Sequence, residues 1–216
     1  MDDLIIVRGI VLKHAPVGDY DWVATIFTSD RGKISAFARS ARKPNSKLSG
    51  CVEPFCFGTF KLFVGKNSYT IVEADIENYF EGFRQDLEGA CYGTFLLELT
   101  SYYTRENSED VELLNLLYLS LKALLNKKIP NRLVRCIFEL RALQIEGEFP
   151  GLPQNMKLNE STVYAIAYIT ESPLGKLFSF SLSDEVLAEL CKVTEDYRKK
   201  FIDRPLKSLE LIEVLG

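Results

Sequence analysis

The most chemically informative part of the sequence is a short basic stretch, ARSARKPNSKLSG, at residues 38–50. Its four cationic side chains stand among small polar residues: Arg39, Arg42, Lys43 and Lys47. The proline and the serines disfavour a regular helix and favour an exposed loop. Guanidinium, ammonium, hydroxyl and free backbone N–H groups are the groups that contact phosphate oxygens. The stretch therefore predicts a phosphate-binding loop, and a solvated basic loop without a ligand is the alternative.

The charge around this stretch differs in sign from that of the whole chain. The net charge is −4, yet residues 31–66 contain eight basic side chains and one acid, Glu53. The segment carries +7, which leaves −11 for the remainder. A polyanion responds to the local field more than to the total charge. Arg31 and Lys33 therefore join the candidate site, and nucleic acid is the expected partner.

Aromatic residues are interleaved with these cations. Single-stranded nucleic acid is often held in a positive groove whose rings stack on the bases. Trp22 and Tyr69 are the stacking candidates. The alternating Phe55, Phe57 and Phe63 are instead expected in a β core.

The sequence contains no recognisable catalytic or metal-binding motif. His14 is its one histidine, and the nearby Pro16 and Gly18 predict that it lies in an exposed turn. Phosphate-cradling and dinucleotide-binding glycine motifs are missing. The five cysteines are spread without a C-x-x-C pair, which predicts free, mostly buried thiols: Cys51, Cys56, Cys91, Cys136 and Cys191. We therefore expect that the protein is not an enzyme and that it binds neither a cofactor nor a metal ion.

The spacing of apolar residues along the sequence changes from a strand-like to a helix-like pattern near residue 80. Before it, short β-branched and aromatic runs predict five strands, at residues 4–13, 22–28, 33–39, 54–64 and 68–73, with a tight turn at 65–67. Five such strands indicate a small barrel, either an OB-fold or an SH3-like barrel. The predicted fold is α+β, with a β-barrel over residues 1–80 and an all-α domain over residues 81–216.

In the second part, apolar residues recur every three or four positions. The predicted helices cover residues 83–103, 111–125, 131–145, 160–169, 184–202 and 205–215. The expected N-caps are Asp110, Asn131, Asn159 and Ser183, and Gly147 is expected to end the third helix.

The third predicted helix is a second candidate site. It places Arg132, Arg135 and Arg141 among apolar residues, an arrangement that suits acidic peptide tails. Core packing with arginines that reach solvent is the alternative. The chain has no uncharged apolar run of about 18 residues, and the acids near its start do not suit a secretory signal, so we expect a cytosolic protein without a membrane span.

Several stretches, taken in order, resemble the RecO family of bacterial recombination mediators. They are GIVL (9–12), GDYD (18–21), TIFT (25–28), GKISAFAR (32–39), SKLSG (46–50), EPF (53–55), FELRAL (138–143), LGKL (174–177) and LKSL (206–209). The likeness covers essentially the whole chain, and residues 32–54 are its most specific part. The family's basic DNA-binding loop corresponds to Arg39, Arg42, Lys43 and Lys47.

The resemblance implies an N-terminal OB-fold, a helical domain and a non-enzymatic role in DNA repair and recombination, in the cytoplasm at the nucleoid. RecO proteins bind single- and double-stranded DNA, anneal complementary strands and, with RecR, help load RecA onto strands coated by single-stranded-DNA-binding protein. In some members the acidic tail of that coating protein docks on the helical domain, which fits Arg132, Arg135 and Arg141. An adaptor for that tail, with DNA contact secondary, is the alternative function.

The sequence departs from many relatives in one respect. They carry a four-cysteine zinc module soon after the segment that matches residues 143–153, whereas this chain has no cysteine there before Cys191. We therefore predict no zinc, a shorter connection into the fourth helix and stability from packing alone.

Overall fold

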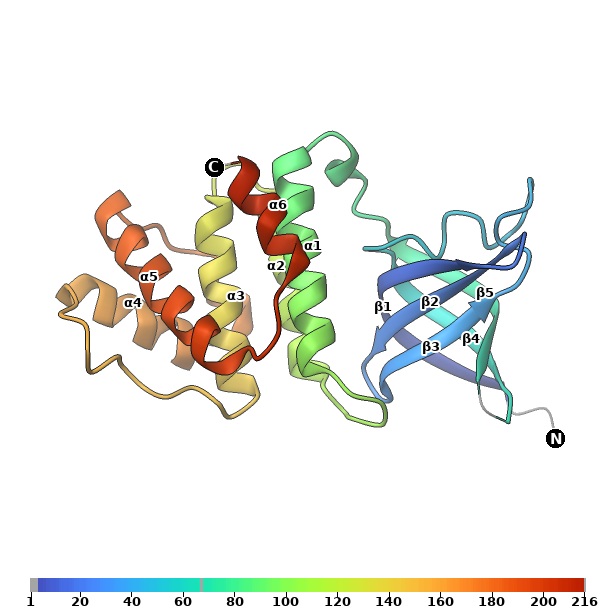
Figure 1. The fold of residues 1–216 in the computed structure, drawn as a ribbon, viewed down its shortest axis with the longest axis horizontal. Helices are drawn as coiled ribbons and strands as arrows, with labels where there is room; N and C mark the ends of the chain where they lie inside the picture. Colours follow the sequence, from blue (N-terminus) through green and yellow to red (C-terminus); the bar gives the residue numbers. More distant parts are fainter. Residues whose placement is uncertain (1–3, 67, 216) are drawn as a thin grey trace. The chain divides into compact units, whose positions relative to one another are not determined.

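The computed structural model describes residues 4–66 and 68–215, which form a β-barrel followed by α-helices (Figure 1). The chain divides into two compact units. One contains the residues up to Glu81 together with Leu97–Leu114, and the other contains Gly82–Leu96 and the residues from Asn115 onward.

The barrel consists of five strands: β1 (Leu4–Val17), β2 (Asp21–Thr28), β3 (Gly32–Ala38), β4 (Phe57–Val64) and β5 (Tyr69–Asn78). It is closed in the order β1-β2-β3-β5-β4. All neighbours are antiparallel except β3 and β5, which pair in parallel through Ala36–Tyr69 and Phe37–Thr70. This is the OB-fold arrangement, so the predicted five-stranded OB-fold barrel is confirmed.

The inward-facing residues of the strands fill the barrel, with Ile26, Ile34, Phe60 and Leu62 almost fully buried. Small residues allow the strands to close around this core. Gly9 of β1 lies opposite Gly58 of β4. A Cβ atom on Gly9 would overlap the Phe27 carbonyl, and one on Gly58 would overlap the Asp75 carbonyl. Only glycine therefore fits at these positions.

The strand boundaries differ from the prediction in three places. β1 continues to Val17, beyond the predicted end at residue 13, and β5 continues to Asn78. β4 begins at Phe57, because residues 54–56 belong to the preceding loop. Phe57 is buried as expected, but Phe55 is half-buried and Phe63 is exposed, so their assignment to the core was wrong. The tight turn predicted at 65–67 includes Asn67, which lies outside the described residues.

The helices and short 3₁₀ turns that follow are η1 (Glu81–Arg84), α1 (Leu87–Tyr103), α2 (Val111–Leu124), α3 (Asn131–Ile145), α4 (Glu160–Glu171), η2 (Leu174–Lys176), α5 (Asp184–Phe201) and α6 (Lys207–Leu215). The all-α prediction for this part is confirmed. The first helix was predicted from residue 83 but begins at Leu87, because the Asp86 carboxylate accepts a hydrogen bond from the Gly89 N–H near the helix start.

Two of the four predicted N-caps are confirmed, one is wrong, and Asp110 at the start of α2 stays a prediction. Asn159 and Ser183 cap α4 and α5 through their side chains. Gly147, with φ +72°, follows the end of α3 as expected. Asn131 is not a cap, because it is the first residue of α3 and Pro130 occupies the cap position without a side-chain hydrogen bond.

α3 supplies much of the helical core. Its buried residues include Leu133, Ile137, Phe138 and Leu140, and the helix packs against both α4 and α5. In residues 4–66 and 68–215, no helix has the length and apolar character needed to cross a membrane. The same residues contain no cluster of three or more His, Cys, Asp or Glu side chains suited to a metal ion, and the absence of zinc stays a prediction.

Candidate nucleic-acid interface

The segment between β3 and β4, residues 39–56, is called the basic loop below. Successive turns build it, with Lys43 N–H donating to the Ser40 carbonyl and Ser46 N–H to the Lys43 carbonyl. Its apolar side chains reach into the barrel core: Ala41, Leu48, Val52 and Cys56. The loop is thus anchored from within, and its cations are held on the outside of a folded segment.

The basic loop runs along the part of β1 that β4 leaves uncovered. β4 pairs with β1 only from Leu4 to Ile10. Beyond that point, Val11 exchanges backbone hydrogen bonds of 2.9 and 3.0 Å with Cys56 and Phe55. Farther along, the Arg42 N–H donates to the Tyr20 carbonyl at 2.9 Å, next to the β1–β2 turn. The loop therefore follows the strand edge and carries Arg42 to the end of the β1–β2 hairpin.

At that end, three cations of the loop region lie over aromatic rings. The Arg42 guanidinium is 5.2 Å from the Trp22 ring centre, and the Lys43 ammonium is 5.0 Å from that of Tyr20. The Arg39 guanidinium is 5.4 Å from the Phe37 ring. Each such contact stabilises an exposed cation by about 0.5–1 kcal/mol. We call these six residues the cation–aromatic cluster.

Tyr20 and Phe37 are the members of the cluster that the sequence did not single out as site residues, and Tyr20 is the more exposed of the two. It is 52% exposed, more than any other large apolar or aromatic side chain in the β1–β2 hairpin apart from Ile6. Because Tyr20 lies in the predicted turn two residues before Trp22, the sequence could have identified it as a further stacking candidate. Its exposure makes Tyr20 better placed than Trp22 to stack on a base.

Trp22 is instead engaged by His14. The two rings are parallel within 2°, with centres 4.0 Å apart. The His14 Nδ1 atom is 3.1 Å from the Val52 carbonyl oxygen, and its side chain is 19% exposed. The predicted exposed turn at His14 was therefore wrong, because β1 continues through this residue and pairs it with Ala24.

The cations of the basic loop differ in how far protein acids neutralise them. Arg39 is 3.4 Å from the Asp21 carboxylate, which also accepts a 2.7 Å hydrogen bond from the Ser40 N–H. Across residues 4–66 and 68–215, Arg42, Lys43 and Lys47 have no ion-pair partner. These three exposed side chains keep their full charge for a ligand.

Arg31, Lys33 and Tyr69 do not join the cluster. Arg31 precedes β3 and Lys33 lies near its start, whereas Arg39 follows its end, and a seven-residue strand spans about 23 Å. The Lys33 ammonium donates a 2.5 Å hydrogen bond to the Ser101 carbonyl. Tyr69 lines a polar cavity of about 370 Å³ to which Lys33 and Glu106 also contribute. The structure thus separates the sequence-predicted DNA-binding residues into two groups.

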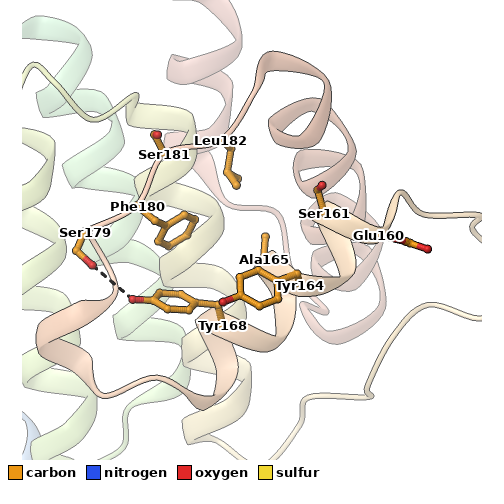
Figure 2. A pocket seen from close by; sticks show the side chains of 9 residues that line it. All are labelled: Glu160, Ser161, Tyr164, Ala165, Tyr168, Ser179, Phe180, Ser181 and Leu182. Carbon is orange, nitrogen blue, oxygen red and sulfur yellow. Dashed lines mark hydrogen bonds between the residues drawn. The ribbon is translucent and has the colours of Figure 1, made fainter.

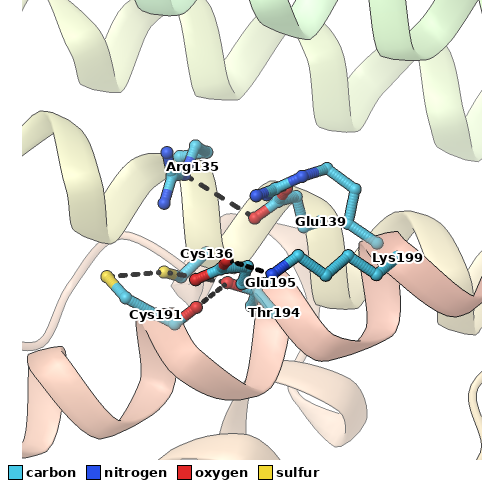
Figure 3. Close-up of polar contacts among 8 residues, drawn as sticks. Arg135, Cys136, Glu139, Cys191, Thr194, Glu195 and Lys199 are labelled. Carbon is cyan, nitrogen blue, oxygen red and sulfur yellow. Dashed lines mark hydrogen bonds and ion pairs between the residues drawn. The ribbon is translucent and has the colours of Figure 1, made fainter. Parts of the chain in front are cut away.

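The three arginines of α3 also have different environments. Arg132 is exposed. Arg135 is 12% exposed and its Nε atom lies 3.7 Å from the buried Glu139 carboxylate (Figure 3). Arg198 of α5 donates to the same carboxylate at 2.5 Å. Arg141 donates to the Thr170 carbonyl at the end of α4. Two of the three arginines are therefore used inside the helical unit.

A hollow of about 610 Å³ beside α4 was not foreseen from the sequence (Figure 2). Tyr164, Tyr168 and Phe180 form its aromatic lining, and the Tyr168 hydroxyl lies 3.4 Å from the Ser179 hydroxyl. The described residues that line it include Glu160 but no lysine or arginine. Such a lining does not suit an acidic peptide.

Comparison with known proteins gives a consistent result along the chain. The family model described as "Recombination protein O N terminal" matches residues 1–80. The model described as "Recombination protein O C terminal" matches residues 84–153 and 146–210.

Curated relatives are similar over nearly the full length. A DNA repair protein RecO from Acetivibrio thermocellus is 31% identical, with 96% of this chain and 95% of the relative covered. The protein of the same name from Clostridium perfringens strain 13 is 28% identical over 96% of both chains. That from Bacillus subtilis is 25% identical over 95% of this chain and 92% of the relative.

Proposed function

Because this chain belongs to the RecO family of DNA repair proteins, we propose that it is a non-enzymatic recombination mediator that binds single- and double-stranded DNA and anneals complementary strands. One observation carries the proposal: an acidic protein presents exposed, unneutralised cations beside aromatic rings on its OB-fold barrel. Residues 1–80 are the proposed DNA-binding domain and residues 81–216 the proposed helical domain.

The mechanism that fits this geometry is electrostatic. Each cation that engages a phosphate releases condensed counterions, which gives affinity that does not depend on sequence. Neutralised strands repel each other less, so complementary bases can meet without any covalent step. The exposed Tyr20 ring offers a surface on which an unpaired base can stack.

The structure supports a ranking of the proposed contact residues. Arg42, Lys43 and Lys47 come first, because they have no ion-pair partner in the part of the chain that the structure describes. Arg39 contributes less, since Asp21 already neutralises part of its charge. Trp22 supports the Arg42 guanidinium. The other predicted residues form a separate, weaker contact region: Arg31, Lys33 and Tyr69.

The family role also includes partners and a location, which we propose for this chain. The proposed partners are RecR, single-stranded-DNA-binding protein and RecA, which this chain would help to load together with RecR. The proposed location is the cytoplasm, at the nucleoid. For the acidic tail of the coating protein we propose Arg132 as the main contact on α3, because Arg135 and Arg141 already bind groups of the protein. Because only one of the three arginines remains for an acidic tail, we consider the adaptor function a weaker proposal than DNA binding.

The decisive experiment compares two triple variants of equal charge. Arg42→Ala/Lys43→Ala/Lys47→Ala removes the unneutralised cations of the basic loop. Lys157→Ala/Lys192→Ala/Lys199→Ala, the control, removes three exposed cations of the helical unit. Binding of labelled single strands and duplexes is measured by fluorescence anisotropy across salt concentrations, and annealing by fluorescence quenching of complementary strands.

The expected results follow from counterion release. The slope of log affinity against log salt should fall by about 2–3 for duplex and about 2 for single strands when three phosphate contacts are lost. The loop variant should also anneal more slowly, while the control behaves like wild type. Equal slopes in the loop variant and wild type, with both folded by circular dichroism, would refute the proposal.

The adaptor role is tested separately. Arg132→Ala should weaken binding of an acidic peptide and leave DNA affinity unchanged. If it instead lowers DNA affinity as strongly as the loop variant does, α3 is part of the DNA site and the assignment of Arg132 is wrong.

A further inference from the structure

The interface between α3 and α5 brings two cysteine sulfurs together. The Sγ atoms of Cys136 and Cys191 are 3.4 Å apart and hydrogen-bonded, although the residues are 55 positions apart in the sequence (Figure 3). Cys136 is fully buried and Cys191 is 7% exposed. Of the two residues, Cys191 is thus the one nearer the surface.

The other cysteines lack this arrangement. Cys51 and Cys56 are buried near each other in the sequence, but their sulfurs donate to the backbone carbonyls of Lys47 and Gly50. Cys91 lies partly exposed on α1. These three thiols serve as internal controls for any chemistry at the pair.

Positive charge surrounds the more accessible sulfur. The hydrogen bond from Cys136, with Arg132 and Arg135 nearby, lowers the pKa of Cys191 to about 6 against the effect of burial. The same hydrogen bond, together with burial, raises the pKa of Cys136 well above its usual value. The groups that face Cys191 are Arg132, Arg135 and Cys136 of α3 and Tyr92 of α1. At neutral pH the pair thus combines a nucleophilic thiolate with a thiol that donates to it.

We propose that Cys136 and Cys191 form an oxidisable dithiol that small hydroperoxides convert into a disulfide linking α3 to α5. This inference is independent of DNA binding. Reversible disulfides of this kind are the form expected in a reducing compartment, where stable structural ones are rare. The two sulfurs must approach from 3.4 Å to about 2.05 Å for the bond to form.

The reaction has two balanced steps. The Cys191 thiolate attacks one oxygen of the hydroperoxide, the S–O bond forms as the O–O bond breaks, and the released oxygen takes up a proton to leave as water or alcohol. Cys136 then loses its proton and attacks the sulfenic sulfur of Cys191. The S–S bond forms as the S–O bond breaks, and the departing hydroxide leaves as water with that proton. Two thiols are oxidised, and one peroxide is reduced.

The test counts free thiols on the intact protein. Reduced protein is treated with hydrogen peroxide, denatured, and labelled with N-ethylmaleimide before mass spectrometry. Untreated protein should take up five labels, one for each cysteine, and treated protein two fewer. Peptide mapping should show a cross-link between Cys136 and Cys191 that dithiothreitol reverses. The rate should increase with pH and level off above about pH 7, as the thiolate fraction saturates.

Matched variants separate this pair from the other thiols. Cys51→Ser/Cys56→Ser should keep the cross-link, whereas Cys136→Ser should stop oxidation at a sulfenic acid on Cys191 that dimedone traps. Five labels after treatment would overturn the proposal. So would a cross-link that involves Cys51, Cys56 or Cys91, or a sulfinic acid on Cys191 in place of the disulfide.

Discussion

The Glu139→Gln substitution removes one buried negative charge with almost no change in shape. In the structure the Glu139 carboxylate is 5% exposed and lies between two guanidiniums that are each 12% exposed. Arg198 donates to one oxygen at 2.5 Å, and the Arg135 Nε atom is 3.7 Å from the other. The glutamine variant would leave both arginines buried without their nearest counter-charge.

The expected loss can be worked from this geometry. Removing one partner of a buried ion pair costs about 3–5 kcal/mol, because the remaining charge stays desolvated. The 3.7 Å contact is longer than a hydrogen bond, and the amide oxygen can still accept from Arg198, so we expect the total to lie within that range and not at twice its value. Domain stabilities are about 5–15 kcal/mol, so the loss is a large fraction of the total.

Urea unfolding followed by circular dichroism at neutral pH measures this loss. With a slope of about 2 kcal/mol per molar urea, the midpoint of the helical transition should fall by about 2 M. The control is Glu195→Gln on α5, whose 2.5 Å pair with Lys199 is exposed on both sides. An exposed pair of this kind contributes about 0.5 kcal/mol or less. If Glu139→Gln shifts the midpoint no more than the control does, Arg135 is solvated and available to ligands, and the reasoning is wrong.

Three further substitutions test other contacts. Gly32→Ala places a Cβ on a residue with φ +61°, where it would overlap the Arg105 carbonyl, and should lower the melting temperature by an amount equivalent to about 2 kcal/mol or more. A hydrogen bond from Lys127 holds the pKa of Asp86 below its usual value, against the effect of burial. That stabilisation is present above about pH 4 and is lost as pH falls through the lower folded-state value, so Asp86→Asn should flatten the acid limb of the melting-temperature profile. Burial raises the pKa of Tyr197 to about 12, so Tyr197→Phe should remove the phenolate absorbance that appears near that pH, and loss of the hydroxyl's 2.6 Å hydrogen bond should cost about 1 kcal/mol in urea unfolding.

The elements were predictable where a local pattern fixes them. The change of hydrophobic period separated strands from helices, and Asn159 and Ser183 marked the starts of α4 and α5. The end of β1 could not be predicted, because Pro16 is a residue type typical of turns. In the fold Pro16 pairs with Trp22 on one side, while β4 has already left the other side of the strand. Proline is tolerated on such an edge, so the strand continues.

The candidate site shows the same division between local and long-range information. Arg42, Lys43 and Lys47 were found together because they are neighbours in the sequence. The sequence shows Glu139 four positions after Arg135, but it cannot show that a guanidinium 59 residues beyond Glu139 completes the buried group. Contacts of that range depend on how α3 and α5 pack, which no local pattern encodes.

The acidic net charge of the protein does not oppose DNA binding at the basic loop. At physiological ionic strength charges are screened over about 8 Å, so distant acids contribute little to the field that a phosphate meets there. Of the acids near the loop, Asp21 is paired with Arg39 and accepts from the Ser40 N–H, whereas Asp19 is exposed in the β1–β2 turn and forms no ion pair with the loop cations in the described part of the chain. A phosphate at the loop therefore meets Arg42, Lys43 and Lys47 with their charges uncompensated. Because the local placement of charge matters more to a polyanion than its sum over the chain, we expect DNA to bind at the basic loop.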